Sequence, residues 1–163
     1  MAHDDPAPDA HATFLATLAA HKKILYKVAF LYGRSEADRQ DLVQEVIVQL
    51  WRSLPGFDGR SALSTWIYRV ALNVALSARR DAARRPRADV PLGDVLLTAP
   101  ADEGTAGVMA QLVERLEPLD RALVLLHLEG HAHDAIAAIL GLSVTNVGTK
   151  LSRIKARLRE ETT

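Results

Sequence analysis

Five basic side chains and no acidic one lie between Thr145 and Arg159, near the end of a chain of 163 residues. Lysines and arginines gathered in this way can neutralise phosphates, which is the chemistry needed to bind a nucleic acid. Charge alone leaves the alternative that this segment is the solvated face of an ordinary helix. The residues that precede it favour nucleic-acid binding.

Residues 136–147 (IAAILGLSVTNV) have the spacing of a helix-turn-helix. The small Ala137 lets two helices cross closely, Gly141 permits a tight turn at positive φ, and Ser143 can cap the second helix. Apolar residues that can fill the wedge between the helices are Leu140, Leu142 and Val147. In this motif the second helix enters the major groove of DNA.

The predicted second helix, about residues 143–160, is amphipathic. Its buried stripe is expected to contain Val147, Leu151, Ile154 and Leu158. The side chains near its start can reach base edges, and the cations further along suit phosphates. The first group is Thr145, Asn146 and Thr149; the second is Lys150, Arg153, Lys155 and Arg157.

Hydrophobic periodicity predicts helices through most of the chain and strands nowhere, so the expected fold class is all-α. Gly33 is predicted to end the first helix, Ser35 to cap the second, and Gly130 to end the helix before the helix-turn-helix. Trp66 is expected in the core. Helices are predicted over about residues 10–31, 35–52, 62–80, 108–116, 118–128, 134–140 and 143–160.

Composition divides the chain into two small helical domains. Residues 85–106 contain three prolines and two glycines, which is typical of a flexible linker. We expect a mobile acidic tail (1–9), a helical domain (10–84), the linker (85–106) and a second helical domain with the helix-turn-helix (107–163). The sequence leaves open whether the two domains of the free chain stay apart or pack on each other.

Several functional classes are disfavoured by composition. The chain has no cysteine, which excludes disulfides, thiolate catalysis and cysteine zinc sites and fits a reducing cytoplasm. No apolar run approaches the length of a membrane span, and the N-terminus lacks the pattern of a signal peptide, so no membrane insertion is expected. No nucleophile–base pair or phosphate-binding glycine loop is evident. We therefore predict no catalytic residue and no cofactor.

A zinc site is the alternative raised by His127, Glu129, His131 and His133. Gly130 interrupts the predicted helix between the first two histidines, and such a group is more typical of a polar surface than of a ligand set. The sequence therefore predicts no metal site.

Further motifs resemble a known family. Residues 41–52 (DLVQEVIVQLWR), 57–61 (FDGRS) and 65–75 (TWIYRVALNVA) resemble region 2 of bacterial sigma factors. Residues 116–121 (LEPLDR) and 128–130 (LEG), together with the helix-turn-helix, resemble region 4. The resemblance is to the small extracytoplasmic-function class and covers about residues 20–80 and 108–160.

This resemblance implies a specificity subunit that catalyses nothing itself. Such a protein binds core RNA polymerase, directs it to promoter DNA and opens the DNA there, and an anti-sigma factor is an expected partner. The main alternative is a stand-alone helix-turn-helix regulator that binds operator DNA without polymerase. A more distant alternative is a helical module that only binds a partner protein.

The resemblance also implies roles for individual residues. The helix over 41–51 would dock on the polymerase clamp through Asp41, Leu42, Gln44, Glu45 and Gln49. The −10 element, with a base held out of the stack, would be read by Phe57, Arg60, Ser61, Tyr68, Arg69, Asn73, Arg79 and Arg80. The −35 element would be contacted by Ser143, Thr145, Asn146, Thr149, Lys150, Arg153, Lys155 and Arg157.

Two positions depart from the family pattern. Gly148 stands inside the recognition helix where many relatives carry Lys or Arg, at a cost of roughly 1 kcal/mol of helix propensity relative to Ala. His131 and His133 replace more usual apolar and aromatic residues before the helix-turn-helix. The pattern of −35 contacts therefore stays open.

Overall fold

The computed structural model describes residues 8–57, 59–60, 62–80 and 115–162. Within these ranges the chain is helical and has no strand, which confirms the predicted fold class. The helices are α1 (Pro8–Tyr32), α2 (Glu36–Ser53), the 3₁₀ helix η1 (Leu54–Gly56), α3 (Leu63–Arg80), α5 (Pro118–Leu128), α6 (His133–Leu140) and α7 (Val144–Thr162). The predicted linker, and all but the end of the helix predicted over 108–116, lie outside the described residues.

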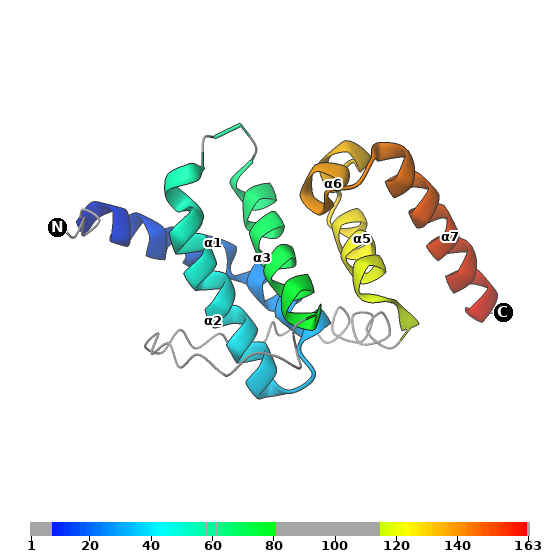
Figure 1. The fold of residues 1–163 in the computed structure, drawn as a ribbon, viewed down its shortest axis with the longest axis horizontal. Coiled ribbons are helices and arrows are strands. Elements are labelled where there is room, and N and C mark those ends of the chain that lie inside the picture. The colour runs from blue at the N-terminus through cyan, green and yellow to red at the C-terminus, as the bar shows by residue number, and fades with distance from the viewer. Residues whose placement is uncertain (1–7, 58, 61, 81–114, 163) are drawn as a thin grey trace.

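The helices form two bundles (Figure 1). In the N-terminal bundle, α1, α2 and α3 pack against one another in all three pairs. In the C-terminal bundle, α7 packs on both α5 and α6. Helix α3 lies at the boundary and contacts both α5 and α6 of the other bundle.

Local capping sets the ends of several helices close to their predicted positions. The Ser35 Oγ atom accepts a hydrogen bond from the Asp38 amide at 3.1 Å, so the predicted cap of α2 is confirmed. The first helix begins at Pro8, earlier than predicted, so the last two residues of the expected mobile tail are helical. Proline suits the first turn because its missing N–H would have no partner there.

Helix α1 is kinked at His21, where φ is −118° and ψ is 15°. The His21 Nδ1 atom donates to the Thr17 carbonyl at 3.0 Å, so the side chain uses the acceptor that the helix backbone needs. A continuous helix was the sequence-based expectation. On the N-terminal side of the kink, the Phe14 ring packs edge-on to Trp51 of α2, with ring centres 4.9 Å apart. The kink thus lets the first turns of α1 cover the end of α2.

Gly33 ends α1 as predicted, but the reason lies in tertiary packing. Its φ is not among the positive values found at the described glycines, so it is no left-handed cap. The Arg39 side chain crosses it and places its guanidinium over the Phe30 ring at 4.6 Å. A Cβ atom on Gly33 would lie 2.5 Å from Arg39 Cγ and 2.9 Å from the Ala29 carbonyl oxygen. Only glycine fits between these groups.

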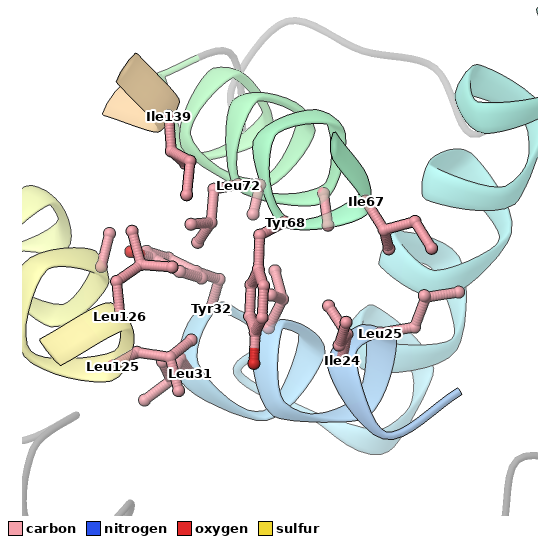
Figure 2. Packing of buried hydrophobic residues seen from close by; sticks show 14 of the residues in the cluster. Ile24, Leu25, Leu31, Tyr32, Ile67, Tyr68, Leu72, Leu125, Leu126 and Ile139 are labelled. Carbon is pink, nitrogen blue, oxygen red and sulfur yellow. The ribbon is translucent and has the colours of Figure 1, made fainter. Parts of the chain in front are cut away.

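One hydrophobic core runs through both bundles, so the described residues pack on each other instead of staying apart. Figure 2 shows side chains of α1, α3, α5 and α6 meeting at the boundary. Leu31 of α1, Leu72 of α3 and Leu126 of α5 are all fully buried there. The compact alternative that the sequence left open is therefore the observed one.

Candidate nucleic-acid interface

The helix-turn-helix is formed by α6 and α7, which meet at a bend of 103°. Gly141 adopts a left-handed conformation at φ +70°, and the amides of Gly141 and Leu142 both donate to the Ala137 carbonyl. The Ser143 Oγ atom accepts from the Asn146 amide at 3.1 Å. The predicted turn and cap are therefore confirmed, and the bend lies in the range usual for this motif.

Helix α7 has one buried face and one accessible face. Val147, Leu151 and Ile154 are buried against α5 and α6, as the amphipathic pattern predicted. The exposed residues include Ser143, Thr145, Asn146, Thr149, Arg153, Lys155 and Arg157, and Lys150 is half-buried. Every residue predicted to contact the −35 element is thus accessible. Arg157 also donates to the Arg115 carbonyl at 3.2 Å, which holds this cation near the start of the C-terminal bundle.

Gly148 lies on α7 facing His133 of α6. A Cβ atom there would be 3.6 Å from His133 Nδ1, an ordinary contact distance, and its φ is not positive. Steric packing therefore does not require glycine here. Nothing in the packing therefore offsets the cost of roughly 1 kcal/mol in helix propensity that Gly148 carries relative to alanine.

Substituting this glycine is expected to stabilise the protein. Gly148→Ala should raise the free energy of unfolding by about 1 kcal/mol because alanine has the higher helix propensity. The matched control is Gly141→Ala, where the added Cβ meets open space but the positive φ remains. That variant should lose about 1 kcal/mol. Urea denaturation of both variants measures the difference, and equal shifts of the same sign would contradict the explanation.

The predicted polymerase-docking residues lie on α2 with different exposures. Asp41 and Gln49 are exposed, whereas Gln44 and Glu45 are half-buried. Leu42 is buried in the core with 9% of its surface exposed, because it belongs to the apolar stripe of the helix. Four of the five positions are therefore polar and at least partly accessible. Leu42 instead packs into the core and helps to hold α2 in the bundle.

The predicted −10 residues are only partly brought together. Arg60, Arg69 and Asn73 are exposed, and the half-buried Phe57 ring lies 5.1 Å from the Trp66 ring. Trp66 is half-buried and packs against the core, close to its expected position. Ser61 lies outside the described residues. Arg79 and Arg80 end α3, but their side chains also lie outside the described part.

Tyr68 is the clearest departure from expectation among these residues. It was expected to be open to DNA, yet only 3% of its surface is exposed. His131 of the C-terminal bundle packs edge-on against its ring, with ring centres 5.3 Å apart. Burial, and secondarily the Glu129 carboxylate, raises the pKa of the Tyr68 hydroxyl above its ordinary value. The cover comes from a remote segment, which the periodicity of α3 could not reveal.

Polar contacts join the two bundles, and sequence reasoning missed them. Arg121 is 7% exposed and donates from Nε to the Leu116 carbonyl and from Nη1 to the Leu31 carbonyl. Tyr32 donates its hydroxyl to the Pro118 carbonyl at 2.6 Å. An arginine directly before the apolar run Ala122–Leu126 was the available sequence signal, but its partner Leu31 lies far away in the chain.

Two of the histidines considered as metal ligands, His127 and His133, lie near each other in the C-terminal bundle. Ring centres of His127 and His133 are 6.4 Å apart. No group of three His, Asp or Glu side chains in the described ranges is arranged to hold a metal ion.

No single helix among the described residues is long and apolar enough to cross a membrane. Helices α6 and α7 together reach that length and apolar composition, but only across the bend of 103° between them.

The two bundles correspond to two known sequence families. Sigma-70 region 2 matches residues 17–85, and sigma-70 region 4 matches residues 107–158. The ECF RNA polymerase sigma factor SigM of Mycobacterium tuberculosis is 30% identical over 141 residues, covering 85% of this chain and 71% of SigM. The chain belongs to the extracytoplasmic-function class of RNA polymerase sigma factors. This family supports the sigma-factor interpretation over the stand-alone regulator.

Other similar proteins differ in length and in sequence identity. SigG of the same organism is 34% identical over 115 residues, which cover 71% of this sigma factor and 30% of SigG. The chain thus spans less than a third of that relative. The solved structure of CnrH in complex with the cytosolic domain of CnrY has a TM-score of 0.67 at 25% identity, covering 93% of this chain and 88% of CnrH.

Proposed function

We propose that this sigma factor binds core RNA polymerase and directs it to promoters, with α2 on the polymerase, α3 at the −10 element and α7 at the −35 element. It catalyses nothing itself, and it acts in the cytoplasm with an anti-sigma factor as a further partner. The functional division is a −10 domain (10–84), a linker (85–106) and a −35 domain (107–163). The observation that carries the proposal is the accessible polar face of α7 at the end of a correctly capped helix-turn-helix.

At the −35 element, the first turn of α7 would supply sequence-specific contacts. Thr145, Asn146 and Thr149 are exposed there, and their short polar side chains can donate to and accept from base edges. The cations that follow would bind phosphates and hold the helix in its groove. Lys150, Arg153 and Lys155 form no ion pair within the described part of the chain, so no carboxylate there competes with a phosphate.

Removal of one of these cations is expected to weaken promoter binding in a salt-dependent way. Arg153→Ala should lower affinity for a duplex carrying the promoter of the protein's own operon, and should reduce the slope of log K against log salt by about one. Fluorescence anisotropy over a series of salt concentrations measures both. Ser152→Ala, also at an exposed position of α7, is the control and should change neither. An unchanged slope in Arg153→Ala would rule out a phosphate contact.

The function itself is tested by run-off transcription with core RNA polymerase on that promoter. A specific transcript should appear only when the chain is added. A stand-alone regulator would bind the promoter without supporting this transcript. Absence of any chain-dependent transcript, from a protein that binds the duplex, would therefore overturn the proposal.

A further inference from the structure

His133 is the first residue of α6, the helix that precedes the recognition helix α7. The two helices pack directly on each other on either side of the bend (Figure 1). The His133 side chain is exposed, so its ring can meet a ligand from the solvent side. An imidazole at this place can therefore donate a hydrogen bond to whatever α7 binds.

Gly148 of α7 gives the imidazole its place. A Cβ atom on Gly148 would lie 3.6 Å from Nδ1 and 3.9 Å from Cε1 of the His133 ring. A methyl group fits at these distances, but a longer side chain at position 148 would extend into the space that the ring occupies. Position 148 thus offers no side chain of its own, and α6 places a hydrogen-bond donor there.

The ring lies at the border of the surface predicted to contact the −35 element. The helical period places residue 148 on the same side of α7 as residue 145, one turn earlier, and residue 152, one turn later. Thr145 and Ser152 are both exposed. Gly148 is half-buried, because it lies between this accessible side and the buried stripe of the helix. His133 is therefore next to the DNA-facing side and not beneath it.

A phosphate of the DNA backbone is the acceptor that suits this position. In a helix-turn-helix the recognition helix enters the major groove, whereas the first helix crosses the backbone. His133 belongs to that first helix, so its ring is expected at the edge of the groove. The Asp134 carboxylate follows it in the chain, but its Oδ1 atom accepts from the Ala135 amide at 2.9 Å and so lies against its own helix.

We propose that His133 is a further DNA-binding residue of the −35 surface, whose imidazole fills the space left by Gly148 and donates to a backbone phosphate. This rests on the proposed function, in which α7 binds the −35 element, and it adds a contact made from α6. It also connects two departures from the family pattern, because the histidine takes over the space of a Lys or Arg at position 148.

The first test separates the ring from its donor. His133→Phe, in the full chain, keeps a ring against Gly148 but cannot donate, so affinity for a duplex with the −35 sequence of the protein's own operon should fall about fivefold. His133→Gln restores a donor and should bind within about twofold of the original chain. The control His11→Phe alters an exposed histidine of the N-terminal bundle and should change nothing. Fluorescence anisotropy measures all three.

The second test combines substitutions at both positions. Gly148→Arg should change the affinity of the original chain by less than about twofold, because the imidazole already occupies the space. In the His133→Ala background the arginine has that space to itself, so the same substitution should raise affinity about fivefold. An equal effect of Gly148→Arg in both backgrounds would overturn the proposal, since the two side chains would then act independently.

Single base-pair changes in the duplex identify the acceptor. Loss of a phosphate contact weakens binding to all sequences alike, so His133→Phe should cost the same factor on every duplex. A loss confined to one base pair would overturn the phosphate contact. Unchanged binding of His133→Phe, while Arg153→Ala binds more weakly, would overturn this inference alone. Failure of the original chain to bind any −35 duplex would overturn the proposed function, and this contact with it.

Discussion

Reversal of two charges on α2 is expected to abolish binding to core RNA polymerase. In Asp41→Arg with Glu45→Arg, two accessible acidic positions one helical turn apart become basic. Like charges placed against a complementary surface cost several kcal/mol, so binding should weaken on the order of a hundredfold or more. Native gel shift or biolayer interferometry with purified core polymerase measures this.

Binding to DNA and folding should survive this double substitution. Affinity for a −35 duplex should be unchanged, because α7 lies in the other bundle. The charge-matched control Glu117→Arg with Asp134→Arg alters two exposed acids of the C-terminal bundle and should leave polymerase binding intact. A normal affinity of the α2 variant for core polymerase would show that the docking surface has been assigned to the wrong helix face.

The largest effect on stability is expected at Gly33. In Gly33→Ala, the new methyl group meets Arg39 Cγ at 2.5 Å and two backbone atoms at 2.9 and 3.0 Å, so α1 and α2 must move apart. Overpacking of this kind costs about 2 kcal/mol. Displacement of Arg39 would also remove its cation from the Phe30 ring.

Gly56 offers the matched control for this prediction. It has nothing within 4 Å of an added Cβ and no positive φ, so Gly56→Ala should leave the free energy of unfolding nearly unchanged. Urea denaturation of the two variants compares them directly. If both variants unfold at the same urea concentration, the close approach of Arg39 is not what requires glycine at position 33.

Much of the local structure was predictable because its causes lie within a few residues. Ser35 and Ser143 cap helices whose free amides are three positions away, and Gly141 turns the chain where only a left-handed residue fits. The stripe of Val147, Leu151 and Ile154 follows from the period of the helix itself. The accessible face of α7 could thus be assigned from sequence alone, since it is the complement of that stripe.

Other features were decided by tertiary contacts between different elements of the fold. Arg39 crosses Gly33, His131 covers Tyr68, and Arg121 reaches the end of α1, and none of these pairs is marked by a local pattern. Local sequence therefore determined the helices, their caps and the face of each that avoids water. Only the tertiary structure decided which exposed faces the second bundle would cover, because that depends on the summed packing of both bundles and not on the period of either.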